Sequence, residues 1–158
     1  MRPIYIFDLD GTLADVSHRL HFISGEKKRW PEFFAACIDD KPIQRVVCTL
    51  RQLMKSGAEI WLWTGRSDEV ELLTQRWLMQ NRVLDFRTWR WLPHAPERFR
   101  MRRNGDHRPD HELKYEWLSE VEPPEYKRIV GVFEDRSRVV QMWRDAGITC
   151  FQVAPGDF

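Results

Sequence analysis

Residues 4–13, Ile-Tyr-Ile-Phe-Asp-Leu-Asp-Gly-Thr-Leu, decide the fold of this chain. The first four are apolar and β-prone, which predicts a buried parallel strand, and the strand ends abruptly at Asp8, Asp10 and Gly11. Two carboxylates held this close resist double ionisation unless a cation or a shared proton lies between them. The pair therefore predicts a metal site or an acid/base dyad. Mg²⁺ suits it, because this ion takes oxygen ligands and commonly links one or two carboxylates to a phosphate.

Length and composition favour one intracellular domain. A chain of 158 residues is long enough to bury one substantial core, so we expect a single domain over residues 1–158. Lys and Arg number 25 against 24 Asp and Glu, so the net charge says nothing about partners. The three cysteines form no Cys-x-x-Cys pair, which argues against a disulfide framework or a zinc site. With no signal peptide and no apolar run of membrane-spanning length, we expect a cytoplasmic protein without a membrane partner.

Residues 14–41 form an insertion between the first strand and the next core helix, and they mix charged with aromatic side chains. We expect a short helical excursion over the site. Two interpretations stay open for it: a surface helix pair packed by its own aromatics, or a cap that faces the substrate. Arg19 stands out, since a planar guanidinium directed at a carboxylate-lined site is suited to a bidentate phosphate contact.

A second strand ends in polar residues as the first one does. Apolar residues at spacings of three and four predict a core helix over residues 42–57. Residues 58–64 then predict a strand, followed by a polar turn at residues 65–67. Taken alone, Thr64 is explained as an ordinary threonine at a strand end. Ser67 is placed to cap the helix that follows.

Residues 82–109 are rich in arginine, with aromatic residues between the arginines. Eight arginines in this part of the chain face three acidic residues. Guanidinium groups neutralise backbone phosphates while aromatic faces stack on bases, so the segment is typical of a surface for single-stranded nucleic acid. The competing interpretation is a third strand over residues 85–91, followed by a solvated loop whose charges have no specific partner. Asn104-Gly105-Asp106 predicts a turn.

Two later elements bring charged residues toward the strand ends. A helix that starts at residue 109 places Lys114 one turn in, where an ammonium offsets the negative charge of carboxylates and phosphate. Solvent exposure is the usual fate of a lysine and is the alternative here. Residues 128–133 predict a fourth strand that ends in a second acidic pair, Glu134 and Asp135, and residues 148–153 predict a fifth.

Alternating strands and helices predict a Rossmann-like α/β fold, with a mostly parallel sheet wound on both faces. We expect five strands in the order 3-2-1-4-5, with the small insertion as a helical cap. In this order the switch point of the topology lies between strands one and four, where ligands of such folds bind. The acids at 8 and 10 would then meet those at 134 and 135. Four negative charges in one crevice need compensating cations, for which we expect Mg²⁺ and Lys114.

The string Asp-Leu-Asp-Gly-Thr at residues 8–12, after a hydrophobic strand, resembles the first motif of the haloacid dehalogenase (HAD) superfamily of phosphotransferases. Thr64 and Lys114 match the second and third motifs, in which a hydroxyl holds a phosphate oxygen and an ammonium offsets negative charge. The resemblance implies that Asp8 is the nucleophile and Asp10 the general acid/base. It also implies four residues for the Mg²⁺ site: Asp8, the main-chain carbonyl of Asp10, Asp135 and, through water, Glu134.

Nearly the whole chain resembles the 3′-phosphatase domain of phage polynucleotide kinases, which repair nucleic-acid ends. The likeness includes the motif at residues 7–13, Thr64-Gly65-Arg66 and the C-terminal residues 150–158. On this resemblance six residues bind the substrate: Thr12, Arg19, Thr64, Gly65, Arg66 and Asp110. The chain departs from the family in having Thr64 in place of serine and Glu134 in place of aspartate. The longer Glu134 side chain leaves open which acid contacts the metal directly.

The resemblance implies Mg²⁺-dependent removal of 3′-phosphates from DNA or RNA ends through an aspartyl-phosphate. The chain has no Gly-x-x-x-x-Gly-Lys-Ser/Thr loop, so we expect no 5′-kinase activity, and a separate kinase or ligase is a candidate partner. Because the insertions are short, we expect the crevice to stay open to a polynucleotide end. Two alternatives stay open: a nucleotidase acting on small nucleoside phosphates, and a non-catalytic module that binds nucleic-acid ends.

Overall fold

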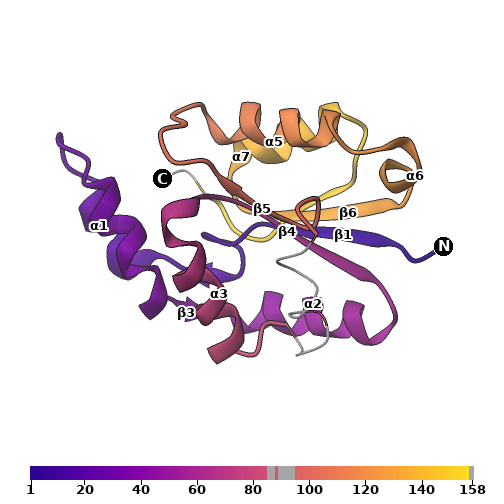
Figure 1. Cartoon of the computed structure of the whole chain (residues 1–158), viewed down its shortest axis with the longest axis horizontal. Coiled ribbons are helices and arrows are strands. Elements are labelled where there is room, and N and C mark those ends of the chain that lie inside the picture. Colours follow the sequence, from indigo (N-terminus) through magenta and orange to yellow (C-terminus); the bar gives the residue numbers. More distant parts are fainter. Residues whose placement is uncertain (85–87, 89–94, 157–158) are drawn as a thin grey trace.

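The structure, a computed structural model, describes residues 1–84, 88 and 95–156. Its centre is a five-stranded parallel sheet in the order β5-β4-β1-β6-β7 (Figure 1). The strands are β1 (Ile4–Phe7), β4 (Glu59–Ser67), β5 (Phe99–Arg102), β6 (Ile129–Glu134) and β7 (Cys150–Gln152). Counted along the chain, this is the predicted order 3-2-1-4-5. The strand that leads to Asp8 is therefore the central one.

Helices cover both faces of the sheet, as Figure 1 shows. One face carries α5 (Asp110–Ser119) and α7 (Ser137–Asp145), and the other carries α2 (Gln44–Lys55) and α3 (Glu71–Gln80). Side-chain alternation along β4 sorts the two cores. Trp61 and Trp63 pack with α5 and α7, whereas Ile60 and Leu62 pack with α2 and α3. Because burying each large apolar side chain contributes about 1.5–3 kcal/mol, these cores fix the strand ends firmly.

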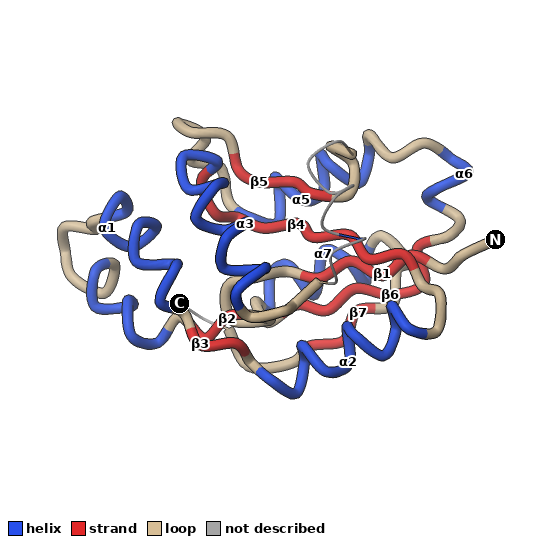
Figure 2. Tube along the Cα trace, turned by 60° about the horizontal axis from the view of Figure 1, so that its bottom comes forward, coloured by secondary structure: helices blue, strands red, loops and turns tan. Residues whose placement is uncertain are grey.

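The segment between β1 and α2 makes a small cap. At its base, β2 (Ala14–Asp15) pairs antiparallel with β3 (Lys41–Pro42). Between these strands lie the 3-10 helices η1 (Ser17–Phe22) and η2 (Ala36–Asp39) and the helix α1 (Trp30–Ala35). Figures 1 and 2 both show the cap beside the carboxyl ends of the sheet strands, at the end of the molecule opposite the N-terminus. This arrangement agrees with the predicted helical cap insertion.

β4 is longer than the sequence predicts. Residues 65–67, expected as a turn, continue the strand, and Ser67 pairs with Arg102 of β5 after a register shift that begins at Thr64. Pairing with β5 is the physical reason, because it supplies hydrogen-bond partners that a turn would lack. The predicted cap at Ser67 is confirmed: its hydroxyl accepts a hydrogen bond from the Glu69 N–H at the start of η3 (Asp68–Val70).

Among the described residues, the strand that pairs with the outer side of β4 is β5, which the sequence analysis did not predict. The alternative strand over residues 85–91 lies outside the described residues except for Thr88. β5 alternates apolar and basic residues, Phe-Arg-Met-Arg. Arginine hides such a strand from a search for apolar runs, since its hydrocarbon stem packs on the sheet while its charged head reaches an acid. The short helix α6 (Pro123–Tyr126) was not predicted either.

Within the part of the chain that the structure describes, no helix has both the length and the apolar character needed to cross a lipid bilayer.

Candidate active site

Acidic residues from the two predicted pairs meet at the carboxyl ends of β1 and β6. Asp8 follows β1, Glu134 ends β6, and Asp135 comes next. The two strands are hydrogen-bonded neighbours, with Phe7 opposite Phe133, so the acids that follow emerge side by side. One carboxylate oxygen from each of Asp8, Glu134 and Asp135 lies within 4.8 Å of the others, and all three residues are buried. Three of the four predicted metal-site residues are thus brought together by their side chains.

Lys114, on α5, provides the positive charge in contact with this cluster. Its Nζ donates hydrogen bonds to Oδ1 of Asp8 at 2.6 Å and to Oε2 of Glu134 at 2.7 Å. Burial lowers the pKa of this ammonium, but the Asp8 and Glu134 carboxylates raise it more, so the pKa lies above its ordinary value. The side chain is 2% exposed, which rules out the alternative of a solvated surface lysine.

One ammonium does not balance three buried carboxylates. Burial, followed by repulsion from Glu134, raises the pKa of Asp8 well above its ordinary value. The same two causes raise the pKa of Asp135 to about 7. Raised carboxyl pKa values mean that the site disfavours its full negative charge, and a second cation beside Lys114 would relieve the repulsion.

The backbone closes tightly around Asp135. Gly11 has a φ of +84°, and a Cβ at this position would lie 2.1 Å from Oδ2 of Asp135. At Gly156 a Cβ would lie 2.0 Å from the same oxygen. Glycine is therefore required on both sides, and the carboxylate is fixed where it faces Asp8 and Glu134. The donor set fits Mg²⁺, since it consists of carboxylate oxygens without histidine or cysteine.

The two predicted hydroxyl residues are fully buried at the edge of this site. The Thr12 hydroxyl donates to Oδ1 of Asp135 over a long 3.4 Å. The Thr64 hydroxyl oxygen accepts a hydrogen bond from the backbone N–H of Arg66 at 3.2 Å. Both hydroxyls thus support neighbouring site residues, and their contact with a phosphate stays a prediction.

Asp10 is held by two arginines. Its Oδ1 accepts hydrogen bonds from Nη2 of Arg19 at 2.8 Å and from Nε of Arg66 at 2.6 Å. Burial raises the pKa of Asp10, but the Arg66 and Arg19 guanidinium groups lower it more, so the carboxyl is ionised at neutral pH. Both arginines are fully buried behind Asp10. Their geometry orients this carboxylate, and the phosphate contact predicted for Arg19 stays a prediction.

Asp40, at the end of the cap, joins the same two arginines and was missed by the sequence analysis. It is 4% exposed, and its oxygens accept hydrogen bonds from Nε of Arg19 at 2.7 Å and from Nη2 of Arg66 at 2.6 Å. Nε2 of His18 lies 2.9 Å from Oδ1 of Asp40. No motif marks Asp40. One indirect signal existed in the sequence. Two arginines were predicted at one site, and two buried guanidinium groups need more acidic partners than Asp10 alone.

Asp110, the first residue of α5, is held by two arginines. One of its oxygens pairs with Arg102 of β5, and the other lies 2.5 Å from Nη1 of Arg136. Gly65 passes so close that a Cβ there would lie 2.5 Å from Oδ1 of Asp110, so a side chain does not fit. Arg102 and Arg136 are candidate site residues that the sequence analysis did not single out. A signal existed for Arg136, which directly follows the second acidic pair.

A cleft of about 760 Å³ opens over Asp8 and Asp10. The cap forms one wall with Trp30 and Phe34, and residues 102–110, from the last residue of β5 onward, form the other. This volume falls within the roughly 300–1,000 Å³ of typical ligand sites. Asp8 and Asp10, two of the four predicted acids, thus line a cleft that is large enough for an organic phosphate.

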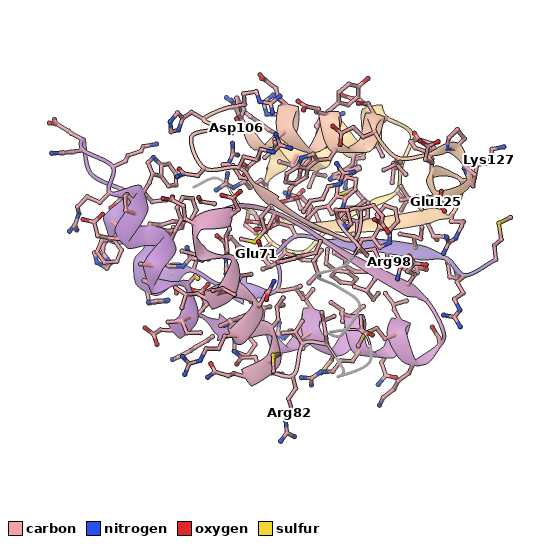
Figure 3. The ribbon with its side chains drawn as sticks, in the orientation of Figure 1. Glu71, Arg82, Arg98, Asp106, Glu125 and Lys127 are labelled. Atoms are coloured by element: carbon pink, nitrogen blue, oxygen red, sulfur yellow. The ribbon has the colours of Figure 1, made fainter. Side chains whose placement is uncertain are left out.

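Most of the described arginines of the segment 82–109 are engaged within the protein. Four form ion pairs: Arg98 with Glu59, Arg100 with Glu120, Arg102 with Asp110, and Arg108 with Asp106 and Glu116. Arg82 points away from the molecule on the side opposite Asp106 (Figure 3). Arg87 and Arg90 lie outside the described residues. Arg103 alone of the described ones is exposed, lines the cleft and has no ion pair with another described residue.

Comparison with known proteins gives the family. The family model "Polynucleotide kinase PNKP phosphatase domain" matches residues 2–158. This chain belongs to the PNKP phosphatase domain family. It is therefore a hydrolase, a phosphatase of the HAD superfamily, and its parallel α/β sheet confirms the predicted fold class.

Two solved structures contain chains similar to this PNKP-family phosphatase. A chain in the structure of the Pnkp1/Rnl/Hen1 complex is 27% identical with a TM-score of 0.76, and the match covers 99% of this chain and 47% of that one. A chain in the Pnkp1/Rnl/Hen1 RNA repair complex is 27% identical with a TM-score of 0.73, covering 99% and 44%. The phosphatase thus spans less than half the length of these relatives.

A third similar structure shares the fold. It is the class C acid phosphatase from Bacillus anthracis, which is 16% identical with a TM-score of 0.64; the match covers 99% of this chain and 68% of that one.

Proposed function

We propose that this PNKP-family phosphatase removes 3′-phosphates from DNA or RNA ends in a Mg²⁺-dependent reaction. The observation that carries the proposal is the cluster of Asp8, Glu134 and Asp135 around Lys114, next to Asp10 at the floor of the cleft. The family model names a polynucleotide kinase, and the similar chains come from an RNA repair complex, which supports a nucleic-acid substrate.

The residues present suit a double displacement at phosphorus. Asp8 attacks phosphorus, the bond from phosphorus to the 3′ oxygen breaks, and Asp10 gives a proton to the leaving oxygen. Water then attacks the aspartyl-phosphate while Asp10 takes its proton, which releases inorganic phosphate and restores Asp8. Lys114 stays protonated and stabilises the negative charge that develops on the transferred group.

Asp10 needs a proton for the first step, although two arginines keep it ionised without substrate. A phosphate monoester beside Asp10 brings negative charge that offsets Arg19 and Arg66 and raises the pKa of the Asp10 carboxyl. We therefore propose that Asp10 becomes the general acid in the substrate complex.

Mg²⁺ would be held by Asp8 and Asp135, with the Asp10 carbonyl and Glu134 completing its surroundings. When bound, it supplies charge neutralisation for the three acids and the phosphate oxygens.

Added Mg²⁺ should raise the melting temperature of metal-free wild-type protein, because a ligand that binds only the native state stabilises it. Asp135→Asn should lose this shift, whereas Asp39→Asn, an exposed cap residue, should keep it. An equal shift in both variants would contradict the site.

A substrate panel tests the activity. We expect kcat/KM to be highest for a 3′-phosphorylated oligonucleotide, lower for a 3′-mononucleotide and lowest for a 5′-mononucleotide. Preference for the 5′-mononucleotide would support the nucleotidase alternative instead. Asp8→Asn should release no phosphate from any of the three, and retained turnover would remove the nucleophile assignment. Metal-replete wild-type protein that binds ends without releasing phosphate would support the binding module.

We further propose that a separate protein supplies the kinase or ligase step, since the similar chains come from assemblies with Rnl and Hen1. Broken RNA with a 3′-phosphate should be sealed by an added polynucleotide kinase without phosphatase activity and an RNA ligase only when this chain is present. Sealing without it would contradict the proposed place in repair.

We also propose a cytoplasmic location, because the three cysteines are free thiols, as is usual in a reducing compartment.

A further inference from the structure

The cap presents an aromatic surface to the cleft. The rings of Trp30 and Phe34 stack with centroids 5.8 Å apart and planes at 24°. Their neighbour Phe33 is 2% exposed and packs under the Arg19 guanidinium, 4.1 Å from its ring centroid, so it has a structural role. Trp30 is 38% exposed and lines the same cleft as Asp8. A partly exposed indole in the cleft offers aromatic surface on which a planar ligand can pack.

Two cations flank this aromatic surface. Nζ of Lys28, on the cap, lies 5.6 Å from the centroid of the Trp30 ring. Arg103 lies on the opposite wall, exposed, while four other arginines of its segment are held in ion pairs. In the described part of the chain, neither Lys28 nor Arg103 has an acidic partner. Both line the cleft and keep their charge available for an anion.

We propose that Trp30 and Phe34 stack on the base of the terminal nucleotide and that Lys28 and Arg103 bind the phosphodiester preceding it. The inference rests on the proposed function, because the 3′-phosphate must sit at Asp8. Stacking tolerates every base, since each has a π face, and it requires an unpaired base. The surface would therefore let the enzyme recognise single-stranded polynucleotide ends of any sequence and discriminate against small phosphate esters.

A base-deletion cycle tests the stacking surface. Trp30→Ala is compared with wild type on a 3′-phosphorylated oligonucleotide and on the same oligonucleotide lacking its terminal base. We expect kcat/KM to fall roughly 5- to 150-fold on the complete substrate, which corresponds to the loss of one base–aromatic stack. On the base-free substrate the kcat/KM of the variant should match that of wild type within about twofold, because the terminal base that would stack on Trp30 is already absent. Trp30→Phe should restore most of the loss.

A charge test addresses Lys28 and Arg103. Arg103→Ala should lower kcat/KM for the oligonucleotide. The ratio of kcat/KM for the 3′-mononucleotide to kcat/KM for p-nitrophenyl phosphate should keep its wild-type value, because neither small substrate has the preceding phosphodiester. The slope of log KM for the oligonucleotide against log salt should shrink by about 0.7 for each phosphate that the variant no longer neutralises. Lys28→Ala should act in the same direction. Lys127→Ala, at the opposite end of the molecule (Figure 3), and Tyr115→Ala, an exposed aromatic on α5, are the controls and should change neither quantity.

Equal losses of Trp30→Ala on the complete and base-free substrates would overturn the stacking proposal, as would an unchanged kcat/KM on both. An unchanged salt slope in Arg103→Ala and Lys28→Ala would overturn the phosphodiester contact. Failure of the proposed function differs from these outcomes, because the wild type itself would then show no preference for the 3′-phosphorylated oligonucleotide. Should Trp30→Ala fail to fold, Trp30→Leu with the same two substrates decides the question.

Discussion

Nζ of Lys114 lies 2.6 Å from Oδ1 of Asp8, although the two residues are 106 positions apart in the chain. The contact joins α5 to the end of β1 and places a buried ammonium against the proposed nucleophile. It also makes the fold depend on the charge balance of the active site, because Lys114 holds Glu134 as well.

Lys114→Met should destabilise the metal-free protein strongly. The substitution leaves Asp8 and Glu134 buried without their cation, and removing one partner of a buried ion pair costs about 3–5 kcal/mol of unfolding free energy. Urea unfolding in the presence of a chelator measures the loss. Added Mg²⁺ should recover part of it, since the ion neutralises the same carboxylates. Lys127→Met is the matched control on the surface, and equal stability of the two variants would contradict the ion-pair role.

Asp40→Ala should lower both stability and activity. The variant leaves the buried guanidinium groups of Arg19 and Arg66 short of an acceptor, for a loss of about 3–5 kcal/mol. Because the same arginines orient Asp10, kcat should fall more than KM rises. The adjacent Asp39→Ala is an exposed control. Wild-type kcat in a folded Asp40→Ala protein would show that Asp10 does not need this support.

The meeting of Asp8 with Glu134 could be predicted from the sequence, because alternating strands and helices allow few sheet orders and both acids directly follow apolar strands. Asp40 could not, since it lies in a cap whose path has no periodic pattern and its role depends on two arginines brought from elsewhere. β5 was not predicted, because its two arginines mask its alternation. The sequence also could not show which arginines of the basic segment pair within the protein, because pairing depends on the three-dimensional arrangement. Arg102 pairs with Asp110, whereas Arg103 lines the cleft.

Gly65→Ala should reduce activity more than stability. The added methyl group would collide with the Asp110 carboxylate, which must move and weaken its pairs with Arg102 and Arg136. Overpacking of this kind costs about 1–3 kcal/mol, measurable by thermal unfolding. We expect a fall in kcat/KM of about tenfold or more, the equivalent of about 1.4 kcal/mol in the barrier. Gly25→Ala, where a Cβ meets nothing within 4 Å, should behave as wild type.

Glu59→Gln should lower stability in a pH-dependent way, at the end of the sheet away from the proposed catalytic acids. Burial raises the pKa of Glu59, but hydrogen bonds from Trp61 and Arg128 and the charge of Arg98 lower it more, so the folded pKa lies below the ordinary value of 4.5. A depressed carboxyl pKa means that the unfolded state binds more protons, so the stabilisation is present above pH 4.5 and is lost as the pH falls through the folded pKa.

The Glu59 side chain is 15% exposed, so its ion pairs should contribute about 1 kcal/mol at pH 7. Urea unfolding of wild type and Glu59→Gln across pH 3–7 measures the difference in unfolding free energy, which should be largest at neutral pH and shrink on acidification. Glu26→Gln, in the exposed part of the cap, should show no such difference. A gap between wild type and Glu59→Gln that stays constant with pH would mean that the glutamine loses packing or a neutral hydrogen bond and that the carboxylate charge contributes nothing.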